Sequence, residues 1–119
     1  MKDVTTSVQQ LKEFVGRFIA ERDWNQFHTP KSLSMGIAVE AAELMEKFQW
    51  CDNSKSYKEA EINREEVEQE LADVIITAIC FANAVGIDIS KVVQNKMELN
   101  AAKYPVHKAK GRYTKYDKL

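Results

Sequence analysis

The sequence predicts an all-α protein, arranged as a four-helix bundle-like unit. Apolar residues recur at helical spacings of three and four along most of the chain, and no segment alternates apolar and polar residues as a half-buried strand would. Four glycines and two prolines are too few for the many tight turns of a sandwich or barrel. The length of 119 residues predicts a single domain, 1–119.

Four segments have helical patterning, at about 6–23, 32–50, 64–85 and 90–104. The first carries an apolar stripe at helical spacing, formed by Val8, Leu11, Val15 and Phe18. The candidates for its N-cap are Thr5, Thr6 and Ser7. Pro30 disfavours helix at the residue before it, so 24–31 is expected to be a connection. Residues 51–63 read as a polar, partly helical loop, and 106–119 as a basic tail.

The third segment predicts a homo-oligomer, because it is apolar on all sides between Val74 and Ala82. A helix that is apolar all round is expected to be buried all round. A strip containing Ile75, Ile79 and Phe81 would therefore be covered by a second copy, in a tetramer or a dimer.

Charge is distributed unevenly along the chain. Residues 40–73 carry 11 acidic and 4 basic side chains, a net charge of −7, whereas 91–119 carry 8 basic and 2 acidic side chains, a net charge of +6. Packing of the two halves would explain this asymmetry, and so would a site where metal-binding carboxylates face phosphate-binding cations. With no leader-like start, no apolar run of membrane-spanning length and only two cysteines, we expect a cytoplasmic protein that uses no membrane.

Two carboxylate pairs are candidates for a metal site. Glu40 and Glu43, and again Glu70 and Asp73, are spaced three residues apart, so each pair shares a helix face. Asp73 directly precedes the apolar segment, where burial would be costly without a partner charge. Oxygen ligands suit Mg²⁺, with Mn²⁺ as a substitute. Carboxylates on a solvated helix face remain the alternative. With only two histidines, and none three residues after a glutamate, a ferritin-like di-iron site is excluded.

Two further groups of residues suggest a nucleotide. On the fourth segment, two cations flank an amide on one helix face, as a triphosphate would require, at Lys96, Asn100 and Lys103. Aromatic residues gather at helix ends and could stack on a base, namely Trp24, Phe27 and Trp50, with His28 as a polar group for the base edge. A solvated basic face and an aromatic cover over the core are the structural alternatives.

At these residues the chain resembles the MazG-like all-α nucleoside triphosphate pyrophosphohydrolases, in particular their dCTP pyrophosphatase-like branch. The family pattern E-x-x-E, a spacer and E-x-x-D is present as Glu40–Glu43 and Glu70–Asp73. The branch-specific strings are ERDWNQFH at 21–28, FQW at 48–50, and KMELN at 96–100 followed by KYPVH at 103–107.

The resemblance implies Mg²⁺ ligands at the four carboxylates and hydrolysis of a nucleoside triphosphate, with dCTP or an analogue as the expected substrate, to the monophosphate and pyrophosphate, in cleansing of the nucleotide pool. It implies a nucleoside pocket at Trp24, Phe27, His28 and Trp50, with Lys96, Asn100 and Lys103 near the phosphates, in a homo-oligomer. Of the four carboxylates, Glu43 is our preferred candidate for positioning the attacking water.

Two positions depart from dCTP-specific relatives and leave base and sugar preference open. Val15 stands where some of them have histidine, and Thr77 where they have tyrosine. Two other functions are also possible, a nucleotide-binding regulator without turnover and a helical module whose basic tail binds nucleic acid. The lack of aromatics alternating with cations before Tyr113 argues against nucleic acid as a partner.

Overall fold

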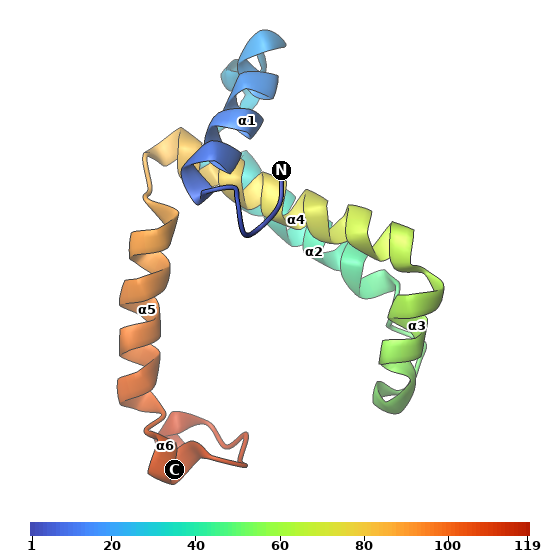
Figure 1. Cartoon of the computed structure of the whole chain (residues 1–119), viewed down its shortest axis with the longest axis vertical. Coiled ribbons are helices and arrows are strands. Elements are labelled where there is room, and N and C mark those ends of the chain that lie inside the picture. Colours follow the sequence, from blue (N-terminus) through green and yellow to red (C-terminus); the bar gives the residue numbers. More distant parts are fainter. The chain divides into compact units, whose positions relative to one another are not determined.

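The computed structural model describes all residues, 1–119, and contains helices and no strands (Figure 1), which confirms the all-α prediction. The α-helices are α1 (Val8–Glu21), α2 (Pro30–Glu46), α3 (Ser56–Ile62), α4 (Arg64–Val85), α5 (Ile89–Lys103) and α6 (Val106–Ala109). The 3₁₀ helices are η1 (Trp24–Phe27), η2 (Asn53–Lys55) and η3 (Tyr116–Lys118). The four predicted helices correspond to α1, α2, α4 and α5, whereas α3 and α6 lie in the predicted loop and tail.

Ser7 defines the start of α1 with a capping box. Its hydroxyl accepts the N–H of Gln10 at 3.1 Å, and the Gln10 side chain accepts the N–H of Ser7 at 2.7 Å. The chain leaves α1 through Asp23, whose φ of 52° lies in the left-handed region, and enters η1. This short turn brings Trp24 back onto Phe18, with an edge-to-face ring separation of 5.8 Å.

Helix α2 begins and ends earlier than the sequence predicted. Thr29 caps it through the N–H of Ser32, and Pro30 occupies its first turn, where proline lacks only an N–H that needs no partner within the helix. The prediction that this helix continues to Trp50 is wrong by four residues, because α2 ends at Glu46. A turn replaces it, closed by the N–H of Cys51 donating to the carbonyl of Phe48 at 3.2 Å.

Helices α2 and α4 form the closest pair of the fold, and α1 packs across α4 (Figure 1). The side-chain amide of Asn83 ties α4 to α1 by donating to the Lys12 carbonyl at 3.0 Å. The buried core is small and lies where these helices meet, at Val15, Ile19, Leu33, Ile79, Cys80 and Ala82.

The single chain leaves part of Val74–Ala82 uncovered, as the sequence predicted. Ile75 is 47% and Ile76 42% exposed, but Ile79 is only 4% exposed, so the prediction that Ile79 belongs to the strip left for a second copy is wrong. Only α1 and α2 pack extensively along α4, and two neighbours leave part of its circumference uncovered.

The chain divides into two compact units, 1–86 and 87–119. In the second unit, the Asp88 carboxylate caps α5 through the N–H of Lys91 at 2.9 Å. The predicted tail is not a free extension. The Lys103 ammonium lies 4.8 Å from the centre of the Tyr116 ring, and Tyr104 meets that ring edge-on at 6.1 Å. No single helix of either unit is long and apolar enough to span a membrane.

Candidate functional site

Three glutamates meet between α2 and α4. Glu40 and Glu43 come from successive turns of α2, and Glu70 comes from α4. Each contributes one carboxylate oxygen to a group in which all the oxygens lie within 4.8 Å of one another. The spacing of three on α2 places both of its carboxylates on the face that meets α4. The sequence predicted these three residues as metal ligands, and the fold brings them together.

Two oxygens in this cluster are buried and lack a hydrogen-bond partner, Oε2 of Glu40 and Oε2 of Glu70. A buried carboxylate oxygen without a partner is unfavourable, and gathering several negative groups adds repulsion. A divalent cation would relieve both penalties. Because every potential ligand atom here is a carboxylate oxygen, the site fits a hard ion such as Mg²⁺ or Mn²⁺ rather than a metal that prefers thiolate or imidazole ligands.

The pKa of Glu70 reflects the burial and charge repulsion in this cluster. Burial raises it above the ordinary value of 4.5, and the negative charge of Glu43 and a side-chain hydrogen bond shared with Glu43 raise it further. The ammonium of Lys47 acts in the opposite direction, and Asp73 adds a smaller upward contribution. Without a cation, Glu70 therefore keeps its proton to a higher pH than an ordinary glutamate does.

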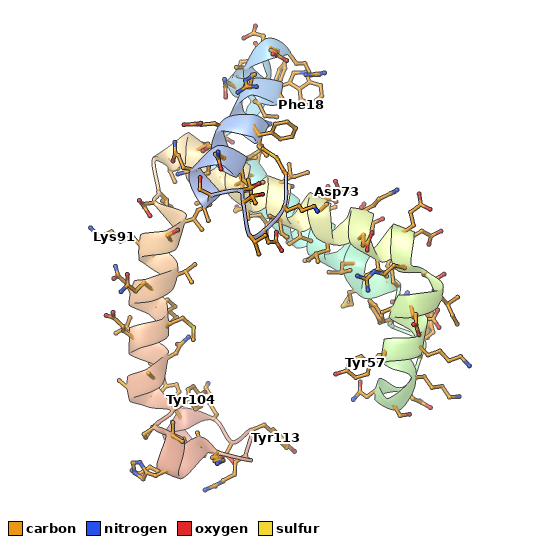
Figure 2. The ribbon with its side chains drawn as sticks, in the orientation of Figure 1. Phe18, Tyr57, Asp73, Lys91, Tyr104 and Tyr113 are labelled. Atoms are coloured by element: carbon orange, nitrogen blue, oxygen red, sulfur yellow. The ribbon has the colours of Figure 1, made fainter.

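Asp73 differs from the other predicted ligands. It lies one turn beyond Glu70 in the middle of α4 (Figure 2), but it is exposed and outside the close group of oxygens. The argument that Asp73 is the carboxylate buried at the start of the apolar segment is therefore wrong. Glu40 and Glu70 carry that burial, because they lie on the surfaces where α2 and α4 meet.

Lys47 caps the C-terminal end of α2, one turn after Glu43 of the cluster. Its ammonium pairs with the Glu66 carboxylate at 3.2 Å, joining the end of α2 to the first half of α4. Because both side chains are partly exposed, the pair contributes little to stability. Its effect on the site is electrostatic, since Lys47 lowers the pKa of Glu70.

An apolar pocket of about 310 Å³ lies beside the first turns of α2. Helices α1, α2 and α4 line it together with η1, at Phe14, Val15, Phe18, Ile19, Trp24, His28, Leu33, Ile76, Thr77 and Cys80. Six of these residues were not predicted from the sequence to line a pocket, namely Phe14, Phe18, Ile19, Leu33, Ile76 and Cys80. The spacing of four between Phe14 and Phe18, which gives the exposed side of α1 an aromatic face, was the available signal.

The four predicted base-binding residues do not all meet in one chain. Trp24 and His28 line the apolar pocket, but Phe27 does not and is 64% exposed. Trp50 is 91% exposed and lines a separate hollow with Glu46 and Glu59. On α2, Leu33 lines the apolar pocket and Glu46 lines the hollow beside Trp50, and the two residues are separated by about 20 Å along the helix axis. Trp24 and Trp50 of one chain therefore cannot enclose the same base.

The predicted phosphate-binding residues lie on α5, in the second unit. Lys96 is exposed, Asn100 is half-buried, and Lys103 is held over Tyr116. They occupy successive turns of one helix, as their spacing predicted. Their role at a phosphate group stays a prediction.

Comparison with known proteins points to one family. Residues 35–119, which include parts of both units, match the model of the MazG-like family. The chain is 34% identical to rat dCTP pyrophosphatase 1 and 33% identical to the human protein, over 95% of this chain and 68% of each relative. A crystal structure of a pyrophosphatase from Archaeoglobus fulgidus is also similar, with a TM-score of 0.78 and 37% identity over 82% of this chain and 91% of that one.

The raised pKa of Glu70 predicts how the metal-free protein responds to pH. Its folded-state pKa exceeds its unfolded value, so protonated Glu70 stabilises the fold below the unfolded pKa, and this contribution is lost as pH rises through the folded pKa. Glu70→Gln removes the charge and should raise Tm in EDTA at about pH 7.5, with the gain shrinking toward about pH 5.

Thermal unfolding followed by circular dichroism measures this difference. Glu61→Gln, which neutralises an exposed carboxylate on α3 away from the cluster, is the control and should leave the pH dependence of Tm unchanged. A Glu70→Gln protein that is less stable than the wild type at every pH would contradict the assignment of an uncompensated charge.

Proposed function

Because the chain belongs to the MazG-like family and is a nucleotide pyrophosphatase, we propose that it is a Mg²⁺-dependent hydrolase of a pyrimidine deoxynucleoside triphosphate, with dCTP or an analogue as substrate. Cleavage between the α and β phosphorus atoms would release the monophosphate and pyrophosphate. The observation that carries this proposal is the pair of buried, unpartnered oxygens of Glu40 and Glu70, which belong to the carboxylate cluster between α2 and α4.

In this proposal Glu40, Glu43 and Glu70 hold the cation, and Asp73 completes the set from the next turn of α4. A bound divalent cation supplies Lewis-acid chemistry, polarising the phosphate oxygens and making water a better nucleophile. Glu43 is more exposed than Glu40 and Glu70, which supports its proposed role of orienting an attacking water and accepting a proton from it. Lys96, Asn100 and Lys103 bind the phosphates.

The apolar pocket receives the nucleoside. Trp24 offers a flat face for stacking, and His28 offers a ring nitrogen to the base edge. Val15 and Thr77, at the positions where dCTP-specific relatives carry histidine and tyrosine, both line this pocket. These smaller side chains leave room for substituted bases, which supports analogues of dCTP as substrates and a role in cleansing the cytoplasmic nucleotide pool.

Metal dependence is the first expected outcome. The protein should release pyrophosphate from dCTP in the presence of Mg²⁺ or Mn²⁺ and be inactive in EDTA. Glu40→Gln should reduce kcat/KM by at least about a hundredfold while keeping the helical circular dichroism spectrum, because it removes a metal ligand at nearly constant volume. Pyrophosphate and monophosphate release from a panel of nucleoside triphosphates measures both activity and preference.

Glu61→Gln is the matched control for this charge change, since Glu61 lies on α3 outside the cluster. Its activity should equal that of the wild type. Hydrolysis that persists in chelator, or in Glu40→Gln, would contradict the metal assignment.

Base stacking is the second expected outcome. Stacking on an aromatic side chain contributes about 1–3 kcal/mol per base. Trp24→Ala should therefore raise KM for the nucleotide by about tenfold, and Trp24→Phe should recover most of the loss. An unchanged KM in Trp24→Ala would contradict a role in stacking and leave Trp24 with only its structural contact to Phe18.

A homo-oligomer, as a tetramer or a dimer, forms part of the proposal. Exposed apolar residues recur at spacings of four on both paired helices, at Met35 and Val39 of α2 and at Leu71 and Ile75 of α4. A second copy that covers them would also bring another Trp50 into the assembly. Association then offers Trp50 a route to a base that it cannot reach in its own chain.

Light scattering tests the assembly. The wild type should give a mass of two or four times 13.6 kDa. Ile75→Glu should lower this mass, because a charge would be buried at the contact. Val4→Glu, at a residue that is 92% exposed near the N-terminus, should not. An active wild-type monomer at micromolar concentration would contradict the assembly.

A further inference from the structure

Gly36 lies in the interior of α2, where glycine is a poor helix former. Neither a turn nor a positive φ requires glycine at this position, because the helix is regular from Pro30 to Glu46. Its small size is explained instead by a contact with α4. A Cβ added at Gly36 would lie 3.2 Å from Cγ2 of Thr77, closer than the 3.5–4.0 Å that carbon atoms prefer.

The methyl group of Thr77 cannot easily turn away from this contact. The Thr77 hydroxyl donates to the backbone carbonyl of Asp73 at 2.8 Å. Rotation about χ1 that moved Cγ2 away would break this hydrogen bond, and a β-branched side chain in a helix has few alternative rotamers. An added Cβ would therefore have to be accommodated by separating α2 from α4.

The contact lies near the carboxylate cluster on both helices. Gly36 is one turn before Glu40 on α2, and Thr77 is two turns after Glu70 on α4. A small increase in helix separation there would move the α2 carboxylates away from Glu70. Mg²⁺ is sensitive to such a change, because it demands near-ideal octahedral geometry with short bonds to oxygen.

We propose that Gly36 is a positioning residue for the metal centre: its contact with Thr77 sets the distance between α2 and α4 at which Glu40 and Glu43 face Glu70, and thereby sets the affinity for Mg²⁺. This inference rests on the proposed function, since it assumes that the cluster holds the cation. It adds a determinant that coordinates no metal and touches no substrate.

A double-mutant cycle tests the proposal. Gly36→Ala adds the Cβ, Thr77→Ser removes only Cγ2 and keeps the hydroxyl that bonds Asp73, and the double variant combines them. Calorimetric titration of the nucleotide-free protein with Mg²⁺, repeated with Mn²⁺, measures the affinity. We expect Gly36→Ala to weaken Mg²⁺ binding by about tenfold, as other substitutions next to metal ligands do, and the double variant to return to within about threefold of the wild type.

Gly16→Ala is the matched control. Gly16 is a half-buried glycine of α1, but a Cβ there would be 3.5 Å from the Asn83 amide nitrogen, an ordinary contact. Its Mg²⁺ affinity should equal that of the wild type. In activity assays, the loss in Gly36→Ala should be recovered at saturating Mg²⁺, because a positioning defect in affinity is overcome by excess cation.

The outcomes distinguish a failure of the proposed function from a failure of the inference about Gly36. A wild type that binds no divalent cation would overturn the proposed function, and the inference with it. A wild type that binds Mg²⁺, together with a Gly36→Ala variant of equal affinity or a double variant that is not restored, would overturn the inference alone. If Gly36→Ala does not fold, the double variant decides by the same criterion.

Discussion

The close pairing of α2 with α4 is the constraint on which the candidate site depends. It buries one oxygen each of Glu40 and Glu70 where neither finds a hydrogen-bond donor. A fold that served only stability would not retain this arrangement, because like charges in a partly desolvated space oppose association of the helices. The pairing would become favourable once a cation took the place of the missing hydrogen-bond donors. Binding of the proposed cation and close packing of the two helices would therefore be thermodynamically linked, each strengthening the other.

Chemical character changes in a fixed order along α2. Leu33 lines the apolar pocket, Gly36 makes the close contact with Thr77, and Glu40 and Glu43 supply carboxylates. Lys47, the residue directly after the helix, adds a positive charge. A nucleotide has a corresponding order, with a flat base at one end and anionic phosphates at the other. One helix thus presents, at steps of about one turn, the surfaces that the two ends of such a molecule need. This correspondence supports the proposed substrate class more directly than the volume of the pocket does.

Local sequence signals were sufficient for most of the helices. For the three clustered carboxylates, spacing made them candidates and the family resemblance identified them as ligands. Caps such as Ser7 and Asp88 are read from neighbouring residues, and the spacing of Glu40 and Glu43 fixes their common face. What local patterns could not predict depends on packing between helices. The burial of Glu70 rather than Asp73 follows from which turn of α4 meets α2, and the pocket depends on η1 returning Trp24 to α1. The family resemblance grouped Trp24 with Trp50, but a family pattern contains no information on whether two residues act within one chain.

The core also explains why the site and the assembly are difficult to separate. Six residues form it, and no large side chain is completely buried. A small core leaves a narrow margin of stability. Here the same helix, α4, supplies the core residues Ile79 and Cys80, the proposed ligand Glu70 and the exposed residue Ile75. Any force that orders α4 therefore acts on all three. A cation at Glu70 and a second copy against Ile75 would each hold the helix in the position that the other requires, so assembly and metal binding are expected to be cooperative even without direct contact between them.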